Sequence, residues 1–169
     1  MRELCAGTGY ASRLPARRRP GAHAVGVDIS PEMIAVGLRK LSSAGITTVD
    51  LVRGDVAALP YPDNSFDVVM AAFGLHEVPT EVRRAAIRES ARVLTPGGRF
   101  VAVDLDRPAL TGLAVDAYLL VMEPGHAREV CGDGLVNLLR ANGFRIDHHD
   151  PATAARPTRT VVACLLPTG

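Results

Sequence analysis

Short apolar runs alternate with segments of helical periodicity along most of this chain. Runs of Val, Ile, Leu and Ala that end at polar or glycine residues predict buried strands at residues 1–5, 22–30, 47–55, 66–75 and 99–106. Amphipathic spacing predicts helices over residues 30–45 and 80–94. Strands that alternate with helices favour a parallel sheet with right-handed crossovers, so the pattern predicts an α/β, doubly wound domain.

The predicted helices carry recognisable end signals. Ser30 is the expected N-cap of the helix over 30–45, Pro31 its first helical residue, and Gly45 its stop. Apolar residues near helical spacing in this segment are Met33, Val36 and Leu41. The helix over 80–94 is expected to end at Pro96-Gly97-Gly98.

The last third of the chain follows a different pattern. A helical stretch (109–122) and a short helix (132–143) precede two strand-like runs, "FRIDHHD" (144–150) and "RTVVACLL" (159–166). The loop between these runs is too short for a helical crossover, so they are expected to pair antiparallel. The sequence therefore predicts a mostly parallel seven-stranded sheet with a C-terminal antiparallel hairpin. At 169 residues, the whole chain (1–169) is expected to form one domain.

Composition narrows the function classes. The chain is 47% hydrophobic with a formal charge of +1, has 4% aromatic residues with no Trp, and shows no basic stripe, which argues against nucleic-acid partners. No apolar run approaches the roughly 18 residues of a membrane helix, and the N-terminus has no signal-peptide pattern. The three cysteines are far apart and lack metal-ligand spacing: Cys5, Cys131 and Cys164. A reduced, cytoplasmic setting is expected.

A glycine turn and a later carboxylate suggest a nucleotide site. Gly7-Thr8-Gly9 follows the first strand, and Asp28 ends the next strand 21 residues after Gly7. This arrangement brings a backbone turn to a ligand and a carboxylate to ribose hydroxyls, and it serves dinucleotides and adenosine equally. A nicotinamide oxidoreductase is disfavoured because Lys40, the only lysine, lies in a predicted helix and no Tyr-x-x-x-Lys pair exists.

Four segments together resemble a known family. They are "ELCAGTG" (3–9), "VGVDISPEMI" (25–34), "GDVAALPYPDNSFDVV" (54–69) and "RVLTPGGRFVAVD" (92–104). In order and spacing they resemble the class I S-adenosylmethionine-dependent methyltransferases, in particular the bacterial group related to ubiquinone/menaquinone C-methyltransferases. The resemblance covers about residues 3–106, which would form a cofactor-binding half. Residues 107–169 would add a substrate-side insertion, a helix and the terminal hairpin to this Rossmann-like fold.

The resemblance implies a set of contacts to S-adenosyl-L-methionine and its product S-adenosyl-L-homocysteine. Glu3 would reach the methionine amino group, Asp28 the ribose hydroxyls and Asp55 the adenine amino group. The full implied set is Glu3, Ala6, Gly7, Thr8, Gly9, Asp28, Ile29, Met33, Gly54, Asp55, Val56, Ala72 and Phe73. Simpler roles stay open for three of these, because Asp28 could cap the following helix, Asp55 could be a turn aspartate and Phe73 could pack in the core.

His76 is the candidate catalytic base. It follows the fourth strand, at the edge where ligands bind in such sheets, and imidazole suits proton removal near neutral pH. Ordering of the loop is the alternative role for His76, and Glu77 either orients it or faces solvent. Asp104, Asp106 and Tyr10 are expected to border the pocket.

Other histidines are not expected to bind a metal. His148 and His149 lack a third ligand, and His126 is expected to be an exposed loop residue. The apolar stretch 109–123 is compatible with a lid over a small apolar substrate, with a packing helix or with a homodimer contact.

The expected function is methyl transfer to a small, apolar or aromatic metabolite. The alternative is a methyltransferase-like protein without methyl transfer: a ligand-binding protein, a partner subunit or a natural-product cyclase. The chain departs from the resembling family in two features that bear on cofactor affinity, and the first of them keeps the alternative open. The first strand starts almost at Met1, where the family usually has preceding helices, so either a late start or an open site is expected. Pro15 falls in the expected first helix and would bend it.

Overall fold

The computed structural model describes residues 1–14, 21–106, 133–153 and 155–167. Some interpretations from the sequence concern residues outside these ranges. They are those of Pro15, of the helical or lid-like stretch 109–123, of His126 and of Cys131.

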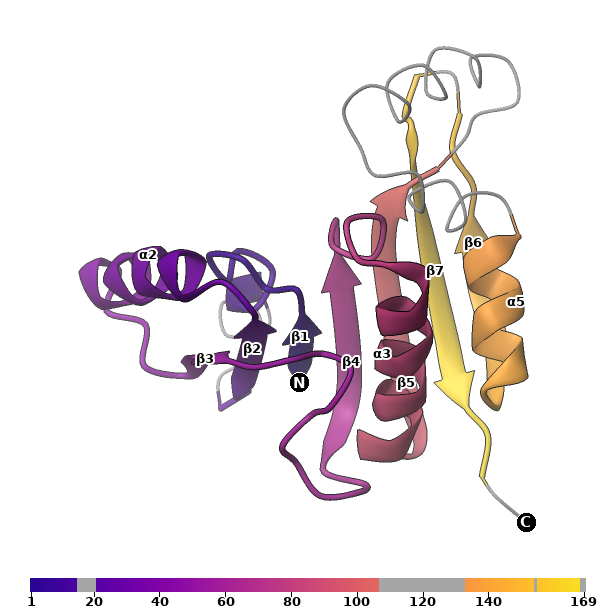
Figure 1. Cartoon of the computed structure of the whole chain (residues 1–169), viewed down its shortest axis with the longest axis horizontal. Helices are drawn as coiled ribbons and strands as arrows, with labels where there is room; N and C mark the ends of the chain where they lie inside the picture. Colours follow the sequence, from indigo (N-terminus) through magenta and orange to yellow (C-terminus); the bar gives the residue numbers. More distant parts are fainter. Residues whose placement is uncertain (15–20, 107–132, 154, 168–169) are drawn as a thin grey trace.

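A single seven-stranded sheet runs through the molecule (Figure 1), in the spatial order β3-β2-β1-β4-β5-β7-β6. β1 to β5 are mutually parallel, and β7 is antiparallel to both β5 and β6. The strands are β1 (Arg2–Leu4), β2 (Ala24–Asp28), β3 (Val49–Arg53), β4 (Phe66–Ala72), β5 (Leu94–Leu105), β6 (Phe144–Asp150) and β7 (Thr158–Leu165). The predicted fold class and the terminal hairpin are confirmed.

The described helices are α2 (Pro31–Ser43), α3 (Thr80–Val93) and α5 (Gly134–Ala141). Ser30 caps α2 as predicted, because its Oγ accepts a hydrogen bond from the Met33 N–H, and Gly45 follows the helix with a left-handed φ of 64°. Ile34, Gly37 and Leu41 form the buried face of α2, whereas Met33 is 48% exposed. Of the apolar positions that the sequence suggested, Leu41 is buried, whereas the other two buried residues, Ile34 and Gly37, each lie one residue after a suggested position.

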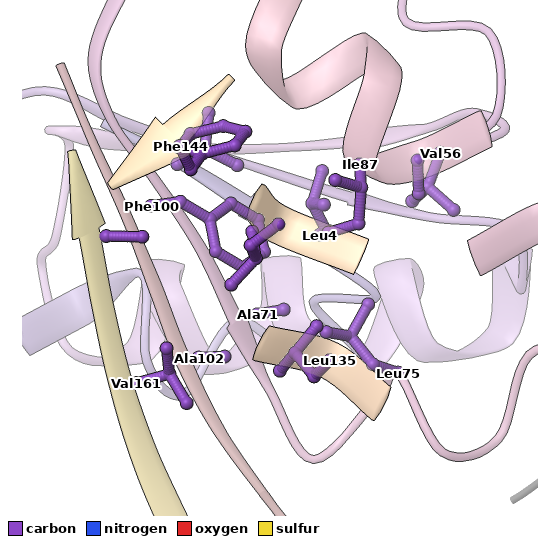
Figure 2. Close-up of a cluster of buried hydrophobic side chains, with 14 of the residues drawn as sticks. Leu4, Val56, Ala71, Leu75, Ile87, Phe100, Ala102, Leu135, Phe144 and Val161 are labelled. Carbon is purple, nitrogen blue, oxygen red and sulfur yellow. The ribbon is translucent and has the colours of Figure 1, made fainter. Parts of the chain in front are cut away.

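Apolar side chains fill the space on both faces of the sheet. The larger cluster joins α3 and α5 to the central strands and includes Leu4, Ile87, Phe100, Leu135 and Phe144 (Figure 2). A smaller cluster packs α2 against β2 and β3 through Ala6, Ala24, Ile34, Leu41, Val49 and Leu51. Helices on both sides of the sheet are the arrangement that a doubly wound pattern requires.

β1 has only three residues, yet it lies in the middle of the sheet, paired with β2 and β4. Its Arg2 side chain is fully buried, with the guanidinium carbon 3.4 Å from the Tyr61 ring centroid and 4.7 Å from that of Phe66. Burial lowers the pKa of Arg2 to about 10. Stacking on two aromatic rings stabilises the cation here.

The end of α3 differs in detail from the sequence expectation. The helix ends at Val93, and β5 begins directly at Leu94, which pairs with Phe66. Pro96-Gly97-Gly98 therefore lies inside β5, where the register with β4 shifts and Gly97 has a φ of 79°. Strand pairing at Leu94 ends the helix before the glycines do.

Candidate functional site

A cavity of about 360 Å³ opens at the carboxyl ends of the parallel strands. Its walls are formed by Cys5, Asp28, Ile29, Gly54, Asp55, Val56, Gly74, Glu77, Val78, Pro79 and Val82. Five of these were predicted as cofactor contacts: Asp28, Ile29, Gly54, Asp55 and Val56. Ligands of open α/β sheets bind at this edge, so the cavity is the candidate cofactor site.

The glycine turn after β1 adjoins the cavity. Gly7 and Gly9 have φ values of 51° and 71°, which residues other than glycine rarely adopt. A hydrogen bond of 2.7 Å from the Gly9 N–H to the Ala6 carbonyl closes the turn. A Cβ atom at Gly7 would meet no atom within 4 Å, so the backbone there is open for close approach of a ligand.

Asp28 is held in a fixed orientation at the cavity wall. Its Oδ2 accepts a hydrogen bond from the Gly7 N–H at 2.7 Å, and its Oδ1 accepts one from the Ser30 N–H at 2.9 Å. The N-cap of α2 is Ser30, so the alternative role of Asp28 as a helix cap is wrong. The carboxylate links the glycine turn to the start of α2 and presents a negative charge to the cavity.

Glu3 lies beneath the glycine turn and is 2% exposed. Its Oε2 accepts hydrogen bonds from the Ser12 N–H, at 2.6 Å, and from the Ser12 hydroxyl. Burial raises the pKa of Glu3, although the Ser12 hydrogen bonds oppose this shift. These hydrogen bonds join β1 to the segment that follows the glycine turn. The implied contact of Glu3 to a methionine amino group stays a prediction.

Asp55 and Val56, which follow β3, form another part of the cavity wall. The Asp55 Oδ1 accepts a hydrogen bond from the Ala57 N–H at 2.8 Å, which is an Asx turn, while Val56 is buried. Asp55 therefore has the turn geometry of the simpler interpretation and also lines the cavity.

Several large apolar side chains near this edge are exposed. Ile29 is 70% exposed, and Met33 and Phe73 are both 48% exposed. Phe73 follows Ala72, the last residue of β4, and has a left-handed φ of 56°, so it is held out of the core rather than packed in it. Exposed apolar residues around a cavity are typical of a ligand site. The predicted contacts that do not line the cavity are Glu3, Ala6, Gly7, Thr8, Gly9, Met33, Ala72 and Phe73.

His76 is buried and does not line the cavity. Its Nδ1 forms a hydrogen bond with the Asp104 Oδ1, and the Leu75 N–H donates to the Asp104 Oδ2 at 3.0 Å. Asp104 is fully buried, at the end of β5. Asp104 therefore orients the imidazole, and Glu77 lines the cavity. An Nδ1–H donated to Asp104 makes Nε2 the basic atom of the ring.

Some cavity residues escaped the sequence analysis. Gly74 lies so close to β1 that a Cβ atom there would be 2.3 Å from the Cys5 Cβ. The signal was available, since Gly74 lies inside the strand predicted over 66–75, and a glycine within a strand often marks close backbone approach. Burial raises the pKa of Cys5 to about 12, so its thiol is neutral and serves as an apolar part of the wall. The remaining missed residues are Val78, Pro79 and Val82.

The other candidate residues lie away from this cavity. Tyr10 is 72% exposed, Asp106 is buried, and His148 and His149 are exposed on β6. Within the described ranges, no group of three His, Cys, Asp or Glu side chains is placed to hold a metal ion. No helix in the same ranges has the length and apolar character needed to cross a membrane.

Comparison with known proteins identifies the family. A family model described as "Methyltransferase domain" matches residues 2–98, which include the glycine turn, Asp28, Asp55 and the whole of α3. The chain belongs to this methyltransferase domain family. The resemblance to class I S-adenosylmethionine-dependent methyltransferases is confirmed, and with it the predicted cofactor.

Curated relatives extend the match. The chain is 39% identical over 111 residues to the demethylmenaquinone methyltransferase of Listeria monocytogenes serotype 4a, covering 65% of this chain and 46% of the relative. It is 37% identical over 111 residues to that of Geobacillus kaustophilus, covering 65% and 47%. The chain spans about half the length of the curated relatives it matches.

Solved structures share the fold. A methyltransferase from Methanosarcina mazei superposes with a TM-score of 0.80 at 22% identity, covering 99% of this chain and 92% of that one. The [4+2]-cyclase SpnF also superposes with a TM-score of 0.80 at 22% identity, covering 99% and 74%. One architecture thus accommodates proteins named for different reactions.

Proposed function

We propose that this methyltransferase domain transfers a methyl group from S-adenosylmethionine to a small, apolar or aromatic acceptor. The observation that carries the proposal is the Asp28 carboxylate, fixed by the Gly7 and Ser30 N–H groups at the wall of a cavity at the carboxyl edge. The names of the curated relatives support an acceptor of the quinone type.

The residues present fit the cofactor. Asp28 would accept hydrogen bonds from the ribose hydroxyls. The open backbone at Gly7 would let the methionine moiety lie close to it. Asp55 and the Val56 N–H would meet the adenine edge, with Ile29 and Met33 beside the base. The bound cofactor supplies an activated methyl group on a sulfonium, so the tasks left to the protein are alignment, exclusion of water and, for acidic acceptors, removal of a proton.

His76 is the proposed base for acceptors that lose a proton. The hydrogen bond between Asp104 and Nδ1 holds the ring in one orientation, and in the proposed step Nε2 takes the proton. Glu77, Val78 and Pro79, which directly follow His76 in the chain, line the cavity together with Val82. An apolar wall of this kind favours an apolar acceptor.

Calorimetry with the whole chain tests the proposal. S-adenosylhomocysteine should bind, and Asp28→Ala should weaken its binding by about 1.5–3 kcal/mol, as loss of a charged hydrogen bond does. Asp50→Ala, which removes an exposed carboxylate from β3, is the matched control and should leave affinity unchanged. Binding of NAD without a response to S-adenosylhomocysteine would overturn the proposal.

The same protein separates the alternative functions. A methyltransferase-like cyclase or partner subunit would bind the cofactor or its product without consuming it. Transfer of a labelled methyl group to a quinol or phenol acceptor supports the proposed reaction. Tight binding together with no transfer to any acceptor of this class favours the alternative.

A further inference from the structure

The connection between β3 and β4, residues 54–65, carries two of the proposed adenine contacts but contains no helix. Its backbone polar groups therefore need partners outside regular secondary structure. At its start, the Gly54 N–H donates to the Asp28 carbonyl at 3.0 Å, which ties the connection to the end of β2. The following residues turn around the Asp55 side chain.

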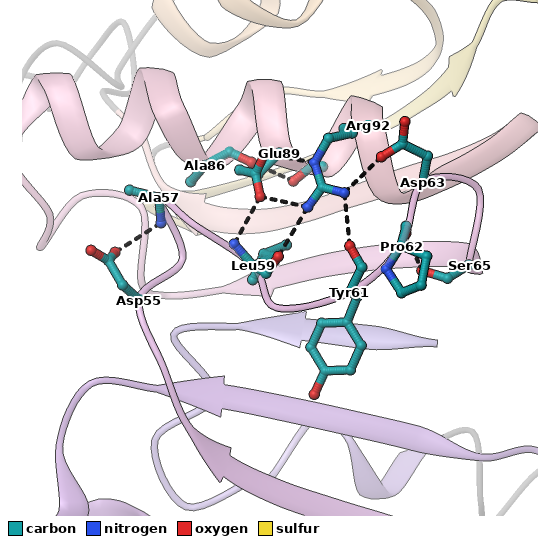
Figure 3. A network of polar contacts seen from close by, with 11 residues as sticks. Asp55, Ala57, Leu59, Tyr61, Pro62, Asp63, Ser65, Ala86, Glu89 and Arg92 are labelled. Atoms are coloured by element: carbon teal, nitrogen blue, oxygen red, sulfur yellow. Dashed lines mark hydrogen bonds and ion pairs between the residues drawn. The ribbon is translucent and has the colours of Figure 1, made fainter.

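Arg92, near the end of α3, holds the part of this connection that follows the Asp55 turn (Figure 3). The Arg92 Nε donates to the Glu89 Oε1 at 2.8 Å, and Nη1 donates to the Tyr61 carbonyl at 2.7 Å and to the Asp63 Oδ1 at 2.8 Å. Nη2 donates to the Leu59 carbonyl at 2.9 Å and to the Glu89 Oε2 at 2.8 Å. A guanidinium has five N–H donors, so every one of them is used.

Glu89 completes this contact. Its Oε2 also accepts a hydrogen bond from the Leu59 N–H at 2.8 Å, so the N–H and the carbonyl of Leu59 are both held by the same ion pair. The Leu59 side chain is also buried, so packing fixes this residue in addition to its two backbone hydrogen bonds. The hydrogen bond from Arg92 lowers the pKa of Glu89, so the pair stays charged at neutral pH.

Residues 55–58 thus form a short arch between two fixed points, Gly54 and Leu59. We propose that Arg92 and Glu89 are positioning residues that set the orientation of Asp55 and Val56 toward the purine, and thereby the selectivity for adenine. This inference rests on the proposed function. Hydrogen bonds weaken steeply outside a narrow range of distance and angle, so a small displacement at Leu59 is sufficient to reduce base discrimination.

The chain contains a matched control for this network. Arg84 forms an ion pair with Glu81 at 3.0 Å, with the same i, i+3 spacing, on the first turns of the same helix α3. Both side chains of this second pair are largely exposed. Lysine has three donors on a flexible stem and cannot reproduce the five contacts of Arg92, so Arg92→Lys disrupts the network while Arg84→Lys only alters a surface pair.

The experiment compares two ligands by calorimetry: S-adenosylhomocysteine and S-inosylhomocysteine, in which a carbonyl replaces the adenine amino group. The ratio of their affinities is the readout, since the folded fraction of a variant affects both ligands equally. Asp55→Asn measures how much Asp55 contributes to the preference for the adenine ligand. Arg92→Lys should reduce the ratio by about tenfold, in line with loss of a charged hydrogen bond at the base. Glu89→Gln, which keeps the shape of the side chain, is the second variant and should reduce it in the same direction.

A reduced ratio in Arg92→Lys and Glu89→Gln, with the parent ratio retained in Arg84→Lys, supports the inference. An unchanged ratio in the first two variants, when Asp55→Asn does reduce it, overturns the inference and leaves the proposed function standing. An unchanged ratio in Asp55→Asn removes this residue from base recognition and overturns the inference together with the adenine contact of the proposed function.

Discussion

His76 and Asp104 are the pair on which the chemistry of the proposed reaction depends. With Nδ1 bonded to the buried Asp104, the imidazole has one orientation, and its removal should affect proton transfer rather than cofactor binding. His76→Gln should lower the methyl-transfer rate by about 10²–10⁴-fold, the usual contribution of a general base, with S-adenosylhomocysteine affinity nearly unchanged. Single-turnover kinetics and calorimetry measure the two effects.

The exposed His149 on β6 supplies the control, because His149→Gln removes a histidine that lies outside the cavity. An unchanged rate in His76→Gln would give His76 the structural role of ordering the loop after β4. Lost cofactor affinity in the same variant would instead make it a part of the nucleotide site.

Glu3 is expected to make stability depend on pH. Burial raises the pKa of Glu3 in the folded protein. The ionised carboxylate therefore lowers the free energy of unfolding at pH values above that pKa, and protonation removes this destabilisation as the pH falls. Glu3→Gln is neutral throughout. The variant should therefore be more stable than the parent at neutral pH, and the difference should shrink as the pH falls through the raised pKa, which lies above the ordinary Glu value of about 4.3.

Urea denaturation over this pH range measures the difference. Glu32→Gln gives the opposite sign as a control, because hydrogen bonds from its own backbone N–H and from Ser30 lower the pKa of this exposed carboxyl. Its stabilisation is present at neutral pH and is lost as the pH falls. A pH-independent difference for Glu3→Gln would contradict the prediction.

The carboxyl ends of β1 and β4 come together at Gly74 and Cys5. Because a Cβ atom at Gly74 would be 2.3 Å from the Cys5 Cβ, Gly74→Ala should lower the free energy of unfolding by about 1–3 kcal/mol, the usual cost of overpacking. Cys5 has a φ of 50°, which glycine adopts readily, so Cys5→Gly should recover part of the loss in the double variant. Thermal unfolding of the two single variants and the double variant tests the coupling, and strictly additive changes would contradict it.

Most strands and helices were predictable because each has a local signal. The Ser30 cap, the apolar run of β4 and the short final loop each depend on residues close together in the chain. The early start of β5 at Leu94 was not predictable, because it depends on pairing with Phe66 across the sheet.

The site shows the same division. Asp28 was found from its spacing to the glycine turn, and it lines the cavity together with four other predicted residues, although the glycine turn itself does not. The pairing of His76 with Asp104 joins two strand ends 28 residues apart, and Arg92 reaches a connection about 30 residues earlier in the chain. No periodicity specifies such contacts; they follow from the order of strands and the path of a loop without regular structure.

The molecule as a whole divides its tasks along the chain. Cys5 after β1, the end of β2, the connection after β3 and the loop after β4 all contribute to the cavity at the carboxyl edge. The hairpin of β6 and β7 lies at the far side of the sheet (Figure 1). The assignment of residues 1–106 to the cofactor and 107–169 to the substrate side stays a prediction, as do the cytoplasmic location and a homodimer.

The strand order also governs how the chain is made. β7, the last strand, lies between β5 and β6, with Leu105 opposite Thr158 and Phe144 opposite Leu165. During synthesis both neighbours are complete before β7 has left the ribosome, so each has an unpaired edge in the nascent protein. Between translation of Leu105 and of Leu165 the β5 edge that later pairs with β7 is open, and such an unpaired edge can pair with a strand of another chain.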